Sequence, residues 1–314
     1  MTAVTATPST RRAELPGGGL PDARRRDSAL TNRPQRVTST AAATAVRIGR
    51  WVLITLAVLV SLFPFYWMLR TALAPADEVF FDGISLIPSK LDWANFARAW
   101  TQGNLGPAVL NGVIVTVSIL VLQLVTCIPA AYVLAKVKMR GVGIALAIVL
   151  GCLLVPTQVT LIPTFIGVNL AGLGDSLPGL VVPFMTSAFG IFLLRQQMMS
   201  IPDSLMEAAR TDGLGHLQTL RRVVIPMAAP GIAAFSVFSV FTHWNDYMWP
   251  LLIARSPSVA TPPLALAVFQ QGDIGFDYSA LAAGAVIVTA PVVILFLVAQ
   301  RRFVQGMSGA EIPG

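Results

Sequence analysis

The stretch that decides the fold is AVLNGVIVTVSILVLQLVTCIPAAYVLA, residues 108–135. It contains no Asp, Glu, Lys, Arg or His. A helix needs about 20 apolar residues to cross the ~30 Å hydrocarbon core of a bilayer. Lipid offers no partner for open backbone N–H and C=O groups, so a chain that crosses it forms helices. The stretch therefore predicts a transmembrane helix.

Further windows share this absence of charge and a length near that of a membrane crossing. They are residues 51–69, 141–173, 176–194, 223–242 and 279–300. The whole chain is 12% charged, with a mean hydropathy of +0.71, whereas soluble domains carry about 25% charged residues. The alternation of about ten residues that marks membrane β-strands is absent. We therefore expect an all-α membrane protein with six transmembrane helices.

The positive charges indicate the orientation of the chain. If the N-terminus is cytoplasmic, six crossings leave only four of the 22 Lys and Arg residues outside, namely Arg70, Lys90, Arg98 and Arg255. Short cytoplasmic loops carry an excess of Lys and Arg. Both termini are thus predicted to be cytoplasmic, and the net charge of +7 reflects topology rather than nucleic-acid binding.

Composition divides the chain into a tail and a membrane domain. Residues 1–45 are rich in Thr, Ser, Pro, Gly, Ala and Arg, with few large apolar side chains. Such a segment buries too little apolar surface to offset the entropy of ordering. The sequence predicts a disordered basic cytoplasmic tail over residues 1–45 and a transmembrane domain over residues 46–314.

A polar insert interrupts the apolar windows at MEAARTDGLGHLQTLRRVVIP, residues 206–226. Each charged residue would cost about 2.5–3.5 kcal/mol at the centre of a membrane helix, so the insert stays outside the bilayer. The S-x-x-E spacing of Ser204 and Glu207 predicts a capping box and a helix that starts at Ser204. Gly213 and Gly215 are expected to end it, and a second short helix to start near His216. We call residues 200–226 the elbow.

The elbow carries a resemblance to a known family. EAARTDG followed by nine residues and VVIP resembles the EAA loop of ABC importer permeases, E-A-A-x3-G-x9-I-x-L-P. The identical positions are Glu207, Ala208, Ala209, Gly213 and Pro226. Residues 243–270 and the ending RRFVQGMSGAEIPG are similar to carbohydrate-uptake permeases, in particular the maltose-type second permease. Gln305 and Glu311 depart from that ending.

The resemblance implies that the chain works with several partner proteins. The elbow would sit in a cleft of an ABC ATPase dimer, with Glu207 facing a basic residue and Gly213 permitting the bend. A second permease subunit would complete the path through the lipid bilayer of the bacterial inner membrane. An extracytoplasmic solute-binding protein would deliver a di- or oligosaccharide, or glycerol-3-phosphate.

Catalytic chemistry is not indicated in this chain. It has no G-x-x-x-x-G-K-[ST] phosphate loop, because the glycine-rich residues 172–179 lack the lysine. His216 and His243 have no metal-ligand neighbours in the sequence. ATP and Mg are therefore expected in the partner ATPase, with no cofactor or metal in this chain and no enzyme activity of its own.

Two groups of polar residues are candidates for solute contact. The first group could line a translocation path, but an aromatic belt at the outer interface is the favoured interpretation. Its members are Trp244, Asn245, Asp246, Tyr247 and Trp249. The second group lies within the apolar windows and could form interhelical hydrogen bonds or line a pore. Its members are Gln123, Thr126, Thr157, Gln158 and Thr160.

Two other classes of membrane protein compete with the importer. An autonomous ion-coupled transporter generally needs ionisable groups inside the membrane, and the six windows contain none. A structural or sensory protein that binds an ATPase-like partner is the other alternative, and loss of solute uptake on deletion of the chain would separate it from a transporter.

Overall fold

The computed structural model describes residues 40–79, 85–270 and 277–308. This part of the chain forms helices and turns but no strand, which confirms the predicted all-α class. The elements are α1 (Thr40–Leu73), η2 (Asp77–Val79), α2 (Ala94–Gln102), α3 (Leu105–Lys136), α4 (Val142–Leu154), α5 (Thr157–Leu170), α6 (Leu177–Val181), η3 (Val182–Phe184), α7 (Ala188–Met199), α8 (Asp203–Thr211), α9 (His216–Thr219), η4 (Leu220–Val224), α10 (Ile225–Met227), α11 (Ala229–Trp244), α12 (Met248–Ile253), α13 (Pro262–Ala265), η5 (Leu266–Gln270) and α14 (Tyr278–Ser308).

The chain divides into two compact units, Met1–Ser61 and Leu62–Gly314. In the first, the described residues form the N-terminal part of α1, and all side chains from Thr44 to Ser61 are exposed. Residues 40–45 of the predicted tail belong to this helix. The rest of that tail and the final residues 309–314 lie outside the described residues.

Three helices are long and apolar enough to cross a membrane by themselves: Thr44–Leu73, Leu105–Lys136 and Tyr278–Val298. The other predicted crossings correspond to helix pairs bent at short breaks, by 98° between α4 and α5, 45° between η3 and α7, and 78° between α10 and α11. Pro156, in an extended conformation, separates α4 from α5. Up to six crossings result if each bent pair is one span, so the number six stays a prediction.

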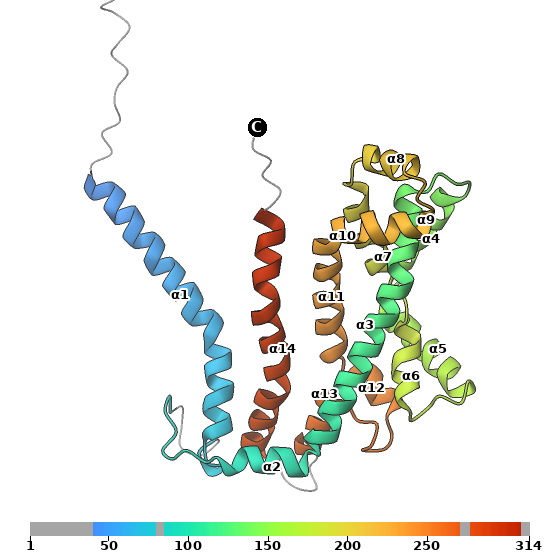
Figure 1. Cartoon of the computed structure of the whole chain (residues 1–314). Coiled ribbons are helices and arrows are strands. Elements are labelled where there is room, and N and C mark those ends of the chain that lie inside the picture. Colours follow the sequence, from blue (N-terminus) through green and yellow to red (C-terminus); the bar gives the residue numbers. More distant parts are fainter. Residues whose placement is uncertain (1–39, 80–84, 271–276, 309–314) are drawn as a thin grey trace, which may run out of the picture. The chain divides into compact units, whose positions relative to one another are not determined.

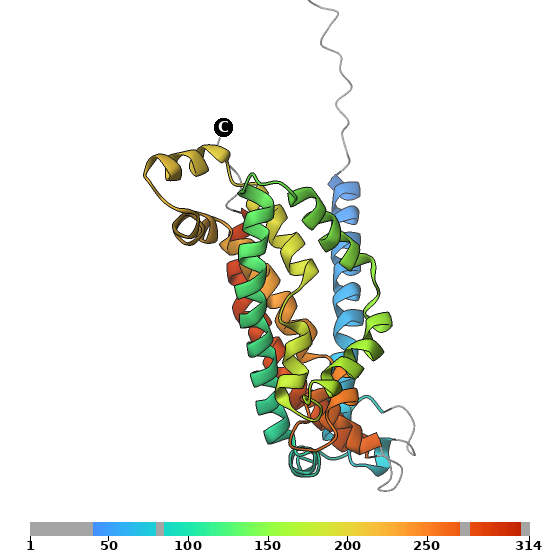
Figure 2. The ribbon, with the colours of Figure 1, turned by 90° about the vertical axis from the view of Figure 1, so that its right-hand side faces the viewer.

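The second unit is built around α3. In Figures 1 and 2, α3 runs from α2 at one end to the elbow at the other, and α11 packs against both α3 and α14. One buried cluster joins the elbow to α3, α7 and α11 and includes Tyr132, Leu194, Met206, Val224 and Phe235. The elbow is therefore packed on the membrane helices rather than tethered only by its ends.

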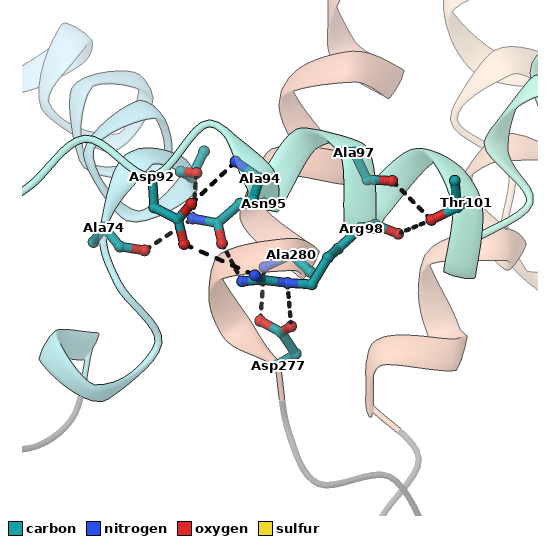
Figure 3. Close-up of polar contacts among 10 residues, drawn as sticks. Ala74, Asp92, Ala94, Asn95, Ala97, Arg98, Thr101, Asp277 and Ala280 are labelled. Atoms are coloured by element: carbon teal, nitrogen blue, oxygen red, sulfur yellow. Dashed lines mark hydrogen bonds and ion pairs between the residues drawn. The ribbon is translucent and has the colours of Figure 1, made fainter.

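The end of α3 opposite the elbow is fixed through α2 (Figure 3). Buried Asn95 donates from Nδ2 to the carbonyl oxygens of Ala72 and Ala74, both at 2.9 Å. Arg98 lies 3.3 Å from Asp277 and 3.8 Å from Asp92 and also donates to Asn95. α2 is thus held to residues at the end of α1 and the start of α14.

α2 carries aromatic side chains at helical spacing. Phe96 and Trp100 lie within Ala94–Gln102, and Trp93 precedes the first residue of the helix. Phe96 packs against the cluster that contains Ala99 and Leu105. Trp93 and Trp100 stay 65% and 50% exposed.

Candidate functional site

The first helix of the elbow starts one residue before the predicted position. α8 begins at Asp203 after Pro202, whose extended backbone (φ −59°, ψ 137°) breaks from the preceding chain. No side chain caps this end by a hydrogen bond, so the predicted capping box of Ser204 and Glu207 is wrong. Ser204 lies inside the first turn, where its backbone is already helical and cannot take the cap conformation.

The end of α8 is as predicted. Gly213 has φ +74°, a conformation that disfavours residues with a Cβ. Its N–H donates to Arg210 O at 3.0 Å, and Leu214 N–H donates to Ala209 O at 3.0 Å. These two bonds are the pattern of a Schellman motif. The glycine therefore reverses the chain at the tip of the elbow.

The return arm of the elbow contains an irregular helix. α9 begins at His216, as predicted, and the Gln218 side chain accepts from the N–H of Gly215 at 3.3 Å. It continues into the π-helical turn η4, a feature often found at functional sites, and then α10. The chain bends by 78° before α11.

Burial separates the two faces of α8. Met206 and Ala209 are buried at 6% and 3% exposure, while Glu207 and Ala208 are exposed, as is Pro226 at the base. Within the described residues, no hydrogen bond or ion pair is found for the Glu207 carboxylate. A small, exposed Ala208 beside a free carboxylate is a surface that another protein can approach closely.

The start of α8 is also tied to α3. Lys136, the last residue of α3, donates from Nζ to Asp203 Oδ1 at 2.7 Å and to Ile201 O at 2.6 Å. The Lys136 ammonium, mainly through its hydrogen bond, holds the pKa of the Asp203 carboxyl below its usual value. Tyr132 OH also lies 3.3 Å from His216 Nδ1. Both arms of the elbow thus contact α3.

A cavity of about 620 Å³ lies beside α5 and α11. We call it the Asp246 cavity, because Asp246 and His243 are the ionisable residues of its lining apart from Cys152. Hydroxyl and amide side chains supply most of the other polar groups: Thr157, Gln158, Thr160, Thr164, Thr186 and Thr242. Phe184 and Trp249 add aromatic surface, and among the described residues no Lys or Arg lines the cavity.

The structure divides the predicted aromatic and polar cluster of residues 244–247 and Trp249. Asp246 lines the cavity and accepts from Trp249 N–H at 3.3 Å. Trp244 is buried and donates from Nε1 to Val288 O at 3.0 Å, and Asn245 donates to Phe241 O at 2.7 Å. Tyr247 lies in a separate groove near Arg255. Trp249 lines this cavity as well, so Asp246 and Trp249 are the two of the five predicted residues that reach it.

The polar residues of the apolar windows fall into two sets. Gln123 and Thr126 form interhelical hydrogen bonds, with Thr126 Oγ1 donating to Met185 O at 2.9 Å. The three others, Thr157, Gln158 and Thr160, line the cavity. Sequence reasoning missed His243, Thr164 and Thr186 as lining residues, since a single sequence gives no signal for which face of a helix meets a cavity.

Comparison with known proteins decides the family. The sequence matches the binding-protein-dependent transport system inner membrane component family over residues 37–309. The chain belongs to this family. It is thus an ABC importer permease, an inner-membrane subunit that is not itself an enzyme, and ATP hydrolysis takes place in a separate subunit.

Individual relatives of the permease cover most of its length. The probable ABC transporter permease protein YurM of Bacillus subtilis (strain 168) is 31% identical over 266 residues, 84% of this chain and 88% of the relative. The diacetylchitobiose uptake system permease protein NgcG of Streptomyces coelicolor is 31% identical, covering 78% and 82%. The sn-glycerol-3-phosphate transport system permease protein UgpE of Yersinia pestis is 29% identical, covering 83% and 95%.

The fold of the permease also matches a solved structure. A chain in the crystal structure of a bacterial ABC transporter involved in the import of the acidic polysaccharide alginate superposes with a TM-score of 0.74. It is 25% identical, and the match covers 83% of this chain and 98% of that one. The helices described above therefore have the arrangement of an ABC importer permease.

Proposed function

We propose that this permease forms one wall of the translocation path for a neutral di- or oligosaccharide in an ATP-driven, binding-protein-dependent importer. The observation that carries the proposal is the charge of the Asp246 cavity. Within the part of the chain that the structure describes, its lining offers one carboxylate, many hydroxyl and amide groups and no Lys or Arg. Sugar hydroxyls can donate to a carboxylate and exchange hydrogen bonds with Thr and Gln, and Trp249 and Phe184 offer surface for the apolar faces of a sugar ring.

Glycerol-3-phosphate and acidic saccharides suit this lining poorly. Phosphate and carboxylate groups are bound above all by Arg and Lys, through charge-assisted hydrogen bonds. A like charge on Asp246 would repel them, and the repulsion is strong where water is partly excluded. The relatives named for glycerol-3-phosphate and alginate therefore share the fold of this chain rather than its proposed solute.

The uncovered surface of α4 and α5 supports a second permease as partner. In α4 no residue is buried, and in α5 only Val168 is. Leu154 and Leu170 are each 84% exposed. Cys152, Thr157, Gln158 and Thr160 of the cavity lining are exposed on the same helices. A second permease that covers this surface would close the cavity into a path.

The elbow is proposed to be the docking site of the ATPase. Its support is the exposed Glu207 and Ala208 on a helix whose other face is buried. The orientation that goes with this docking places the elbow and both termini in the cytoplasm, in agreement with the distribution of Lys and Arg. ATP and Mg would be bound by the ATPase.

Uptake of matched solutes tests the proposed function. In proteoliposomes with the complete importer, we expect transport of neutral oligosaccharides and none of glycerol-3-phosphate or uronic-acid oligosaccharides. Asp246→Asn keeps the oxygen that accepts from Trp249 but removes the charge, and a lost hydrogen bond to a charged group costs about 1.5–3 kcal/mol. We therefore expect maximal uptake in this variant to be lower by roughly tenfold to a hundredfold.

The control is Tyr247→Phe, which changes a neighbouring polar side chain outside the cavity and should leave uptake unchanged. Transport of glycerol-3-phosphate in place of neutral saccharides would overturn the proposal for the solute while leaving the family unchanged.

A further inference from the structure

α3 connects the elbow with the wall of the Asp246 cavity. Lys136 at its end holds Asp203 and Ile201 of the elbow, and its side chain is only 6% exposed. A buried ammonium is costly to desolvate unless it is paired, so the hydrogen bonds of Lys136 favour a stable attachment of the elbow to α3. Figure 1 shows α3 running from this point through the length of the second unit to α2.

Gln123 of α3 holds the cavity wall at three points. Its Nε2 donates to Phe184 O at 3.0 Å and lies 3.2 Å from His243 Nε2. Its Oε1 accepts from Ser239 Oγ at 2.7 Å. Gln123 is 3% exposed, and Phe184 and His243 both line the cavity. A displacement of α3 at this level therefore moves two lining residues directly.

Pro129 lies between the two attachments and could weaken the connection, because proline removes a helical hydrogen bond. The neighbouring segment 185–195 bridges this position. Before the proline, Ser187 N–H donates to Cys127 Sγ at 3.4 Å, and after it Arg195 Nε donates to Leu134 O at 3.2 Å. The two halves of α3 are thus held to one segment and move with it.

We propose that α3 carries movement of the elbow to the cavity, with Lys136 as the positioning residue at one end and Gln123 at the other. This proposal rests on the proposed function of the elbow as ATPase docking site. With the outer end of α3 fixed through α2, a pull at Lys136 tilts the helix. Gln123 is 18 residues from Leu105, about 27 Å at 1.5 Å per residue, so it moves about six-tenths as far as Lys136.

The experiment measures solute transported per ATP hydrolysed, in proteoliposomes with the complete importer. Lys136→Met keeps a long apolar side chain but loses both hydrogen bonds, and we expect the ratio to fall roughly tenfold while ATP hydrolysis continues. Lys136→Arg should restore most of the ratio. The matched control is Lys138→Met, which removes an exposed lysine two residues further along and should change nothing.

Two further variants test Gln123, the residue of α3 that contacts the cavity wall. Gln123→Met should lower the same ratio, and the Lys136→Met and Gln123→Met double variant should fall little further than either single variant, because one connection is broken twice. If Lys136→Met fails to assemble with the ATPase, Asp203→Asn replaces it, and a severalfold fall is expected.

A wild-type ratio in assembled Lys136→Met or Asp203→Asn complexes would overturn the role of Lys136. Fully additive effects in the double variant would overturn the connection through α3. Failure of the proposed function can be distinguished from failure of the connection through α3. In that case, solute and binding protein would not stimulate ATP hydrolysis by the wild-type complex.

Discussion

At the scale of single residues, the EAA positions divide between surface and core. Glu207 and Ala208 face outward, whereas Ala209 is 3% exposed and packs inside the elbow. At Gly213 the backbone conformation favours glycine, because φ is +74°. Space for a side chain does not, since no atom lies within 4 Å of the position a Cβ would take. One short motif therefore combines exposed residues, a residue packed inside the elbow and a residue that forms a turn.

Glu207 is the residue whose charge we expect to matter to the partner. Glu207→Lys changes an exposed side chain, so the permease should still insert and fold. Reversal of the charge should lower solute uptake roughly tenfold or more by uncoupling it from ATP hydrolysis. Uptake and hydrolysis measured together in proteoliposomes check this, with Glu207→Gln as a variant of the same size. Normal uptake by Glu207→Lys would contradict the role.

At the scale of helices, close packing between α7 and α11 depends on a missing side chain. A Cβ on Gly190 would lie 2.5 Å from the Phe235 ring, and Phe235 is 1% exposed. Contacts this short force neighbouring atoms to shift in a well-packed interior. Gly190 therefore sets the distance between the two helices beside the buried cluster that holds the elbow.

Gly190→Ala should destabilise the permease by about 1–3 kcal/mol, the usual cost of overpacking. The measurement is the melting temperature of the purified protein in detergent. Gly167→Ala is the control, because Gly167 is also helical but has no atom within 4 Å of the added Cβ. We expect it to be neutral or stabilising by up to about 1 kcal/mol. The double variant Gly190→Ala, Phe235→Leu should recover part of the stability lost in Gly190→Ala. Equal melting temperatures for Gly190→Ala and Gly167→Ala would refute the packing argument.

At the scale of the whole molecule, apolar side chains stay uncovered on α4 and α5, and one face of α8 is exposed. Apolar helix surfaces are stable in a bilayer only against lipid or other subunits. Part of the lining of the Asp246 cavity, including Thr157 and Gln158, is exposed on α5. ATP hydrolysis takes place in a separate subunit, so the isolated chain is one part of an assembly.

Affinity purification of the tagged permease from native membranes in mild detergent should retain a second permease and a nucleotide-binding subunit. Mass spectrometry of the retained proteins identifies them, and a co-purifying binding protein would lead to the solute. Chain purified with Glu207→Lys should lose the ATPase more readily than the second permease. Recovery of well-folded chain alone would favour an autonomous transporter.

The sequence by itself determined the class of the protein and the position of its elbow. Uncharged windows long enough to cross a bilayer predict helices, and the charges of residues 207–222 predict that this segment lies outside the membrane. Gly213 and His216 marked turn and helix start, because glycine conformation and local spacing are properties of neighbouring residues. The start of α8 at Asp203 was missed by one position, since Pro202 rather than a Ser204 cap sets it.

Only the tertiary structure decided which polar residues act together. Asp246, Thr157 and Thr186 come from distant segments and meet at one cavity, while Trp244 donates instead to the Val288 carbonyl. The pairing of Lys136 with Asp203 spans 67 positions. Such contacts depend on how helices are rotated and bent against one another, and the residue pattern of a uniformly apolar helix leaves its rotation unspecified.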